Sequence, residues 1–180
     1  MADPAALEPS DHGPLPAPGR AAIWAPWRIE YIRSEKEATG CILCRAAGAP
    51  EDRAALVLLR GKSAFALLNR YPYNSGHLMV SPYRHVPELD ALADDELTDL
   101  MRMVQRCVAI LRRLMKPEGF NIGMNLGRAA GAGIEDHVHV HIVPRWIGDT
   151  NCMPVLADTR VVPQALLDTW AELKRAATEP

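Results

Sequence analysis

The 180-residue sequence contains no apolar run close to the roughly 20 residues that a membrane-spanning helix needs, so we expect no membrane span. Its N-terminus carries Asp3, Glu8 and Asp11, with no basic stretch ahead of an apolar one, and we expect no secretory signal there. The sequence also lacks an excess of positive charge, because 20 Lys and Arg face 22 Asp and Glu. This balance argues against a nucleic acid polymer as partner and leaves room for a small ligand held by local groups.

Cysteine is scarce, with four residues in the chain, and two of them form Cys41-x-x-Cys44. This usage fits a reducing compartment better than a disulfide scaffold, so we expect a cytoplasmic protein. Hydrophobic residues, at 48 % of the chain, are plentiful enough for a well-formed core.

The composition divides the chain into four parts. Residues 1–22 are rich in Pro, Ala and Gly, which predicts a flexible tail. Residues 23–40 contain two Trp and a Tyr, which predicts a segment that packs on the body or on a partner subunit. We expect one compact domain over residues 41–150 and a C-terminal extension with a helix over residues 151–180. The sequence shows no internal repeat and no second domain.

Hydrophobic periodicity predicts one long helix, several strands and a short terminal helix. Apolar residues recur every three or four positions from Asp94, the expected N-cap, to Met115, and Pro117 follows as a stop signal. The predicted strands are Leu56–Arg60, Ala64–Asn69, His77–Ser81, Phe120–Leu126 and the histidine-rich segment 137–143; the terminal helix is predicted within Val161–Ala177, beginning near Pro163. This order indicates an α+β protein with a mostly antiparallel sheet of about five strands.

Three histidines, His137, His139 and His141, alternate with aliphatic residues. Strict alternation predicts three imidazoles on one face of a strand, roughly 6.5–7 Å apart, and buried aliphatic residues on the other face. Such rings could share a metal ion as ligands, all three together in a metalloenzyme. Alternatively, one neutral imidazole acts as a nucleophile and a neighbour supports it. A separate histidine, His77, is interpreted as a structural hydrogen-bonding residue.

A glycine-rich loop, residues 127–133, leads into the histidine segment. Its glycines, which include Gly131 and Gly133, allow backbone N–H groups to converge on phosphate oxygens, although such loops also serve as tight connections. Beside three imidazoles the loop favours a phosphate ester or anhydride as the ligand.

The pattern His-φ-His-φ-His-φ-φ, where φ is a hydrophobic residue, resembles the signature of the histidine triad (HIT) superfamily of nucleotidyl hydrolases and transferases. Residues 65–80 look like the nucleoside-binding strands of that superfamily, and residues 121–127 look like the strand that precedes its triad. The similarity covers roughly residues 41–150. Residues 144–151 and the Trp-Ala-Pro-Trp-Arg segment resemble the branch that contains the fragile-histidine-triad hydrolases and the bacterial diadenosine tetraphosphate phosphorylases.

The resemblance implies a HIT-like fold and a role for each matching residue. His139 would attack the α-phosphorus and form a nucleotidyl-histidine, while the main chain of His137 accepts its Nδ1 proton. His141 would contact phosphate oxygens, Asn69 would bind the ribose hydroxyls and Leu67 would pack against the base. The groups implied to hold phosphate oxygens are Asn125 and the amides around Gly131 and Gly133.

The sequence departs from many relatives just before the triad. Relatives often carry Gln, Thr or Ser three or four residues before the first histidine, where it can assist the leaving group. Here those positions are Ile134 and Gly133. A water molecule, a substrate phosphate or Arg145 could take that role instead.

Cys41 and Cys44 permit three interpretations. They could be two small buried residues, or a redox pair, although no clear thioredoxin-like unit follows them. They could also bind structural zinc, for which the resemblance to several HIT relatives suggests His85 and His137 as the other two ligands. A closed Cys2His2 set of this kind would be structural and would leave His139 free.

The resemblance therefore implies an enzyme that cleaves a dinucleoside polyphosphate, first of all diadenosine tetraphosphate, with phosphate favoured over water as the acceptor. Two alternatives stay open: a nucleoside phosphoramidase, and a zinc-stabilised nucleotide-binding module with little catalysis. Relatives form dimers by extending the sheet and packing the long helices, which implies a homodimer.

Overall fold

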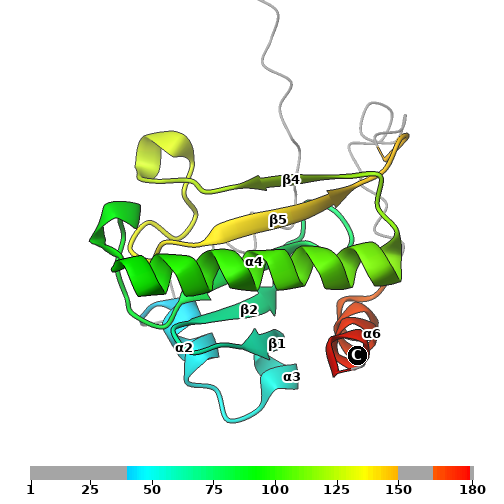
Figure 1. Cartoon of the computed structure of the whole chain (residues 1–180), viewed down its shortest axis with the longest axis horizontal. Coiled ribbons are helices and arrows are strands. Elements are labelled where there is room, and N and C mark those ends of the chain that lie inside the picture. Colours follow the sequence, from blue (N-terminus) through cyan, green and yellow to red (C-terminus); the bar gives the residue numbers. More distant parts are fainter. Residues whose placement is uncertain (1–39, 150–163, 179–180) are drawn as a thin grey trace, which may run out of the picture.

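The computed structural model describes residues 40–149 and 164–178, in which helices flank a five-stranded antiparallel sheet with the order β1-β2-β3-β5-β4 (Figure 1). The strands are β1 (Val57–Arg60), β2 (Ala64–Leu68), β3 (Leu78–Pro82), β4 (Gly119–Gly123) and β5 (Val140–Arg145). The helices are α2 (Ile42–Ala47), α3 (Asp52–Ala55), α4 (Asp94–Met115) and α6 (Leu166–Thr178), with the short 3-10 turns η1 (Leu89–Ala91) and η2 (Arg128–Ala130). The predicted α+β class and antiparallel sheet are confirmed. The predicted N-terminal tail and aromatic segment lie outside the described residues, apart from residue 40.

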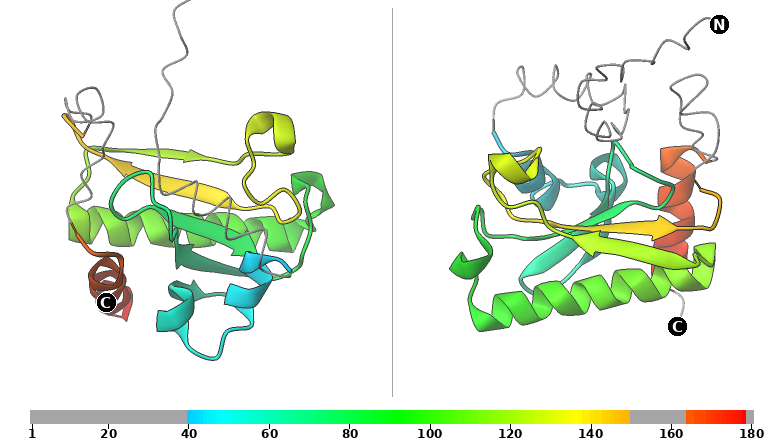
Figure 2. Two further views of the ribbon diagram at one scale, coloured as in Figure 1. Left: turned by 180° about the vertical axis from the view of Figure 1, so that it is seen from behind. Right: turned by 90° about the horizontal axis from the view of Figure 1, so that it is seen from above.

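Both faces of the sheet are covered by other parts of the chain. Successive residues of a strand point to opposite faces, so they pack in different hydrophobic clusters. In β2, Ala66 and Leu68 belong to the main core beneath α4, whereas Phe65 and Leu67 belong to a second cluster on the opposite face. Leu43 of α2 lies in that second cluster. Viewed from above, the sheet accordingly lies between α4 and the segment that contains α2 (Figure 2).

The long helix α4 extends over its whole predicted length. Its N-cap is Ala93 instead of the predicted Asp94, because the Glu96 carboxylate accepts the Ala93 N–H at 2.9 Å and caps the first turn. At the other end Lys116 takes a left-handed conformation (φ 47°), and Pro117 cannot continue the helix. No helix among the described residues has the length and apolarity to cross a membrane.

The predicted terminal helix is present but begins at Leu166, later than the expected start near Pro163, which lies outside the described residues. Leu173 and Ala176 of this helix, α6, are buried in the main core beside α4 and β1. The helix therefore belongs to the folded body (Figure 1).

Each of the five predicted strands has at least one boundary that was wrong. Strand β2 ends at Leu68 instead of Asn69, and β3 covers Leu78–Pro82 instead of His77–Ser81. The first strand begins at Val57, since Leu56 ends α3 with a left-handed backbone (φ 59°). The fourth strand covers Gly119–Gly123 instead of continuing to residue 126, because the chain turns there into the glycine-rich loop. Strand β5 begins at Val140, so only His141 of the three histidines lies on it.

Candidate active site and metal centre

A cavity of about 550 Å³ opens on the sheet face opposite α4. Much of its wall is apolar, with side chains from α2, α3 and the second hydrophobic cluster; these include Ile42, Ala46, Ala55, Leu67, Met79 and Ile134. Its polar lining comes from His139, His141, Asn69, Asn125 and the two arginines Arg45 and Arg70. An apolar slot that ends in a few convergent polar groups is typical of a site for a small organic ligand.

His139 is held in one tautomer by the backbone. Its Nδ1 lies 2.8 Å from the carbonyl oxygen of His137, so Nδ1–H donates this hydrogen bond and Nε2 keeps its lone pair. The ring is 3 % exposed, and this burial lowers its pKa, although the bond to His137 acts in the opposite direction. A neutral imidazole with a free lone pair at a cavity wall is suited to nucleophilic attack.

His141 is held through a second histidine, His77, which is fully buried. The backbone N–H of Tyr73 donates to His77 Nδ1 at 3.1 Å, so His77 carries its proton on Nε2. That nitrogen lies 3.0 Å from His141 Nδ1 and donates to it. In the neutral ring, the remaining proton of His141 is therefore on Nε2, which makes this nitrogen a donor beside His139, whose ring centroid is 4.8 Å away.

Sequence analysis gave His77 no role at the site. One signal that could have found it is the preceding glycine. Gly76 has a positive φ of 74°, and a Cβ there would lie 2.6 Å from the sulfur of Met115, so only glycine fits.

The other predicted nucleotide-binding residues fall in different places. Leu67, Asn69, Asn125 and Gly133 line the cavity, whereas Gly131 ends η2 in a left-handed conformation (φ 82°) outside that lining. The Asn69 side-chain oxygen accepts the N–H of Tyr71 at 2.9 Å, and its amide nitrogen donates one hydrogen to His77 Nδ1 at 3.4 Å. The second hydrogen of that NH2 group is the donor that a ligand could use.

Arg145, considered above as a leaving-group acid, also lies outside the cavity lining. It donates from Nε and Nη2 to Asp149 at 2.6 and 2.8 Å, and from Nη1 to Asn121 at 2.8 Å. At the two positions before the triad, Gly133 and Ile134 line the cavity without an acidic proton.

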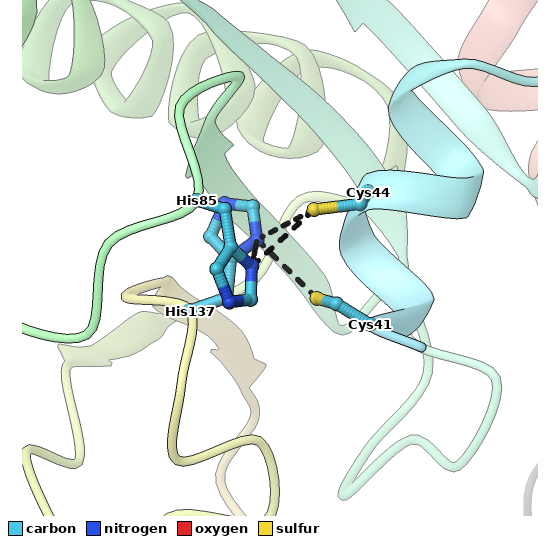
Figure 3. A group of neighbouring side chains, drawn as sticks. All are labelled: Cys41, Cys44, His85 and His137. Carbon is cyan, nitrogen blue, oxygen red and sulfur yellow. Dashed lines mark hydrogen bonds between the residues drawn. The ribbon is translucent and has the colours of Figure 1, made fainter. Parts of the chain in front are cut away.

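The predicted metal ligands come together at one end of α2 (Figure 3). His137 Nδ1 lies 3.3 Å from Cys41 Sγ, 3.5 Å from Cys44 Sγ and 3.3 Å from His85 Nδ1, and Cys44 Sγ lies 3.3 Å from His85 Nδ1. Metal–sulfur bonds of about 2.3 Å and metal–nitrogen bonds of about 2.0 Å in a tetrahedron place neighbouring ligand atoms at such separations. These four residues therefore fit one metal ion.

Two further features suit the same ion. His137 Nε2 donates to the carbonyl oxygen of Pro82 at 2.9 Å, which leaves the Nδ1 lone pair for the metal. Burial, with the neighbouring Cys41 thiol, raises the pKa of Cys44, so a cation would supply the charge that keeps this thiol deprotonated. Because the His137 carbonyl also holds His139, which lines the cavity, His137 links the metal centre to the cavity.

Known proteins resemble this chain in sequence and in fold. The family model "HIT domain" matches residues 51–146. The AP-4-A phosphorylase of Mycobacterium tuberculosis is 40 % identical over 154 residues, which cover 82 % of this chain and 79 % of that protein. The asymmetrical bis(5'-nucleosyl)-tetraphosphatase of Schizosaccharomyces pombe is 39 % identical over 93 residues, 52 % of this chain and 50 % of that protein.

Among solved structures, a Zn-bound histidine triad family protein from Mycobacterium smegmatis superimposes with a TM-score of 0.62 at 25 % identity, covering 77 % of this chain and 93 % of that one. Family model, relatives and fold agree with one another. The chain belongs to the HIT domain family.

Proposed function

We propose that this protein is a nucleotidyltransferase that cleaves dinucleoside polyphosphates, diadenosine tetraphosphate first among them, through a nucleotidyl-histidine intermediate. The observation that carries the proposal is the His139 tautomer, with Nδ1 bound to the His137 carbonyl and Nε2 left with its lone pair at the cavity wall. The names of the relatives from M. tuberculosis and S. pombe support the same substrate class.

The reaction then follows in two displacements. The Nε2 lone pair of His139 attacks the α-phosphorus, the bond from that phosphorus to its bridging oxygen breaks, and ATP leaves. An oxygen of inorganic phosphate next attacks the nucleotidyl-histidine, and the phosphorus–nitrogen bond breaks to release ADP. The Nε2–H of His141 is placed to donate to a phosphate oxygen, where negative charge develops.

The missing leaving-group side chain favours this substrate class over a phosphoramidate. A departing ATP carries its charge on phosphate oxygens that are largely deprotonated near pH 7, so it needs no proton from the protein. An amine leaving group does need one, and neither Gly133 nor Ile134 can supply it.

The cavity matches the rest of the ligand. Leu67 and Ile42 would pack against the base, and the Asn69 amide would donate to the ribose hydroxyls. Asn125 and the backbone at Gly133 would meet the phosphates.

Incubation with diadenosine tetraphosphate, with and without inorganic phosphate, tests the reaction and its acceptor. We expect ADP and ATP in equal amounts, formed only when phosphate is present. Formation of ATP and AMP regardless of phosphate would identify water as the acceptor, and no cleavage under either condition would refute the proposed function.

We further propose that the Cys2His2 centre binds Zn²⁺ as a closed structural site. Its two sulfur and two nitrogen ligands suit zinc, and the Zn-bound relative from M. smegmatis supports the same ion. When bound, the ion would fix α2 and the first histidine of the triad. Metal analysis of purified protein should give one zinc per chain in the wild type and a loss of zinc in Cys41→Ala; equal metal content in both would contradict the proposal.

Reduced thiol ligands also support a cytoplasmic location.

A homodimer is the oligomeric state that we propose. Strand β4 lies at the edge of the sheet with one side unpaired by the described residues, and such edges favour pairing with a second chain. Ile122 on this strand is 47 % exposed, and Leu97 and Met101 form an exposed apolar pair one turn apart on α4. Together they offer an apolar surface that a second copy would cover.

A further inference from the structure

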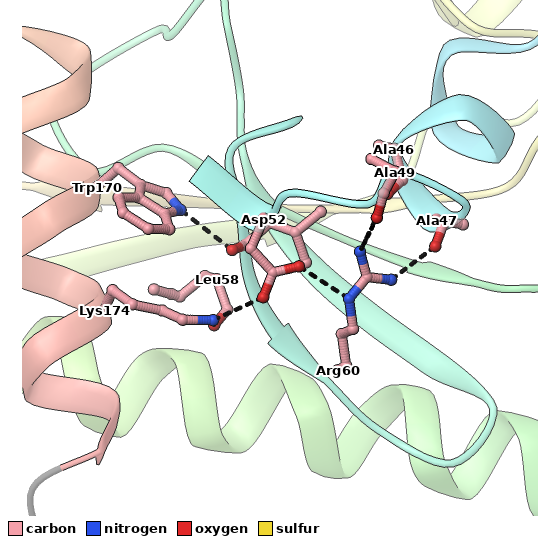
Figure 4. A network of polar contacts seen from close by, with 9 residues as sticks. Ala46, Ala47, Ala49, Asp52, Leu58, Arg60, Trp170 and Lys174 are labelled. Carbon is pink, nitrogen blue, oxygen red and sulfur yellow. Dashed lines mark hydrogen bonds and ion pairs between the residues drawn. The ribbon is translucent and has the colours of Figure 1, made fainter. Parts of the chain in front are cut away.

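The C-terminal helix α6 is joined to the wall of the cavity by a network of charged hydrogen bonds, although it lies outside the residues that the family model matches. Lys174 Nζ donates to Asp52 Oδ2 at 2.9 Å and to the carbonyl oxygen of Leu58 at 2.9 Å (Figure 4). Asp52 is the first residue of α3. Lys174 of α6 thus holds the start of the short helix that follows α2.

Asp52 continues the network to a third element. Its other oxygen, Oδ1, accepts from Arg60 Nε at 2.9 Å, at the end of β1. Arg60 Nη1 donates to the carbonyl oxygen of Ala47 at 2.6 Å, and Nη2 donates at 3.4 Å to the carbonyls of Ala46 and Ala49. The Ala46 and Ala47 carbonyls lie at the C-terminal end of α2, where a helix has unpaired acceptors and the negative end of its dipole, and Ala49 follows this end.

The two helices joined in this way, α2 and α3, need contacts with other parts of the chain to be stable. Helix α2 has six residues and α3 has four, and neither has a side-chain hydrogen bond at its N-cap. Helices this short are unstable alone and depend on tertiary contacts. Yet Ile42 and Ala46 of α2, and Ala54 and Ala55 of α3, line the cavity. The position of this wall therefore depends on what holds the two helices.

The side chains of the network are about one third exposed, at 31 % for Asp52 and 32 % for both Arg60 and Lys174. Partial burial opposes the charge on Asp52, but hydrogen bonds from Lys174 and Arg60 outweigh it and keep the pKa of the carboxyl below its usual value. Asp52 is therefore charged near pH 7, and each of its carboxylate oxygens accepts from a basic side chain.

We propose that Lys174, Asp52 and Arg60 act as positioning residues for the nucleoside: they hold the α2–α3 wall and set the affinity for the substrate without taking part in the chemistry at His139. This inference rests on the proposed function, because it assigns the wall to nucleoside binding. The triad is positioned separately, through His137 and His77.

The test uses the variants Lys174→Met and Arg60→Met, which keep the aliphatic stems and remove the charges. We expect each to raise the KM for diadenosine tetraphosphate and the Kd for AMP about tenfold, because each removes at least two hydrogen bonds that hold the α2–α3 wall. The kcat should stay within about twofold, since the wall contacts the nucleoside equally in the substrate and in the transition state. Lys174→Arg, which restores a cationic donor, should return both constants toward wild type.

A matched control comes from the same helix. Trp170 Nε1 donates to the carbonyl oxygen of Val57 at 3.0 Å, so Trp170→Phe removes a hydrogen bond between α6 and β1 without touching Asp52. We expect this variant to be less stable to urea but to bind AMP as the wild type does.

AMP titration by calorimetry, with circular dichroism to establish folding, decides the matter. An unchanged Kd in folded Lys174→Met and Arg60→Met, a rise of the same size in Trp170→Phe, or a wild type that does not bind AMP would overturn the inference. A wild type that binds AMP but does not cleave diadenosine tetraphosphate would refute the proposed function alone. In that case a selective rise in the Kd of the two charge variants would still support the network.

Discussion

At the scale of single residues, backbone groups determine which ring nitrogen of each histidine in the site carries the proton. The Pro82 carbonyl fixes the proton of His137 on Nε2, and the His137 carbonyl fixes that of His139 on Nδ1. The Tyr73 amide fixes His77, and through it His141. The other nitrogen of each triad ring thereby has a defined character: a lone pair for a metal on His137, a lone pair for nucleophilic attack on His139 and an N–H donor on His141.

Two substitutions of His77 should separate its two hydrogen bonds. The amide nitrogen of Gln can reach the place of His77 Nε2 and donate to His141, whereas the shorter Asn can mimic only the Nδ1 acceptor for Tyr73. We therefore expect His77→Asn to lower kcat at least about tenfold and His77→Gln to stay closer to wild type, with KM little changed in both. Steady-state kinetics would contradict this role of His77 if the two variants were equally active.

At the scale of secondary-structure elements, the carboxylate of Asp99 ties α4 to the turn between β1 and β2. Its Oδ2 accepts the N–H of Ser63 at 2.7 Å, the Ser63 hydroxyl at 2.9 Å and the N–H of Ala64 at 3.1 Å. The backbone hydrogen bond from Ser63 is the largest influence, and together these bonds hold the pKa of Asp99 below its usual value against partial burial.

Asp99→Ala should therefore lower the free energy of unfolding near pH 7 by about 1 kcal/mol, the usual net value of a partly exposed hydrogen-bonded group. A carboxyl whose pKa is lower in the folded state stabilises the protein above its unfolded pKa, near 4, and loses this effect as the pH falls through the folded value. The difference between wild type and variant in urea unfolding should shrink below about pH 4. A difference that stays constant from pH 7 into that range would show that the Asp99 charge does not stabilise the fold.

Some elements of the fold could be predicted from the sequence and others could not, for physical reasons. Helix α4 was predictable because its apolar periodicity is long and regular, and strand β2 because it is a short continuous apolar run. Helices α2 and α3 were not predicted, since they are too short to have a period and are held by Arg60 and Lys174 from distant parts of the chain.

The same reasoning applies to the site. The triad could be predicted because its three histidines alternate within five neighbouring residues of the sequence. The prediction that all three lie on one strand was wrong, since β5 begins at Val140, after His137 and His139. His77 approaches His141 only because β3 pairs with β5, with Met79 opposite His141, and no local pattern reports such a pairing. The Cys2His2 set likewise joins residues up to 96 positions apart, and the resemblance to relatives, not spacing, suggested it.

At the scale of the whole molecule, the unpaired edge of the sheet tests the proposed homodimer. Ile122 pairs with Ile142, which faces α4, so Ile122 lies on the same side of the sheet as that helix. Ile122→Lys should convert a dimer into a monomer, because burying an unpaired ammonium costs several kcal/mol. Light scattering after gel filtration measures the mass.

Leu167→Lys is the matched control for this substitution, since Leu167 is 48 % exposed on α6, away from β4. We expect it to leave the dimer intact. A wild-type monomer, or a dimer that survives Ile122→Lys, would contradict the proposed interface.

The central claim concerns one bond, between Nε2 of His139 and phosphorus. Intact-protein mass spectrometry after rapid mixing with diadenosine tetraphosphate, with phosphate left out, tests it most directly. We expect a mass increase equal to one adenylyl group in the wild type, which disappears when phosphate is added, and no increase in His139→Ala. An adduct that persists in folded His139→Ala, or a wild type that turns over without any adduct, would contradict covalent catalysis through His139.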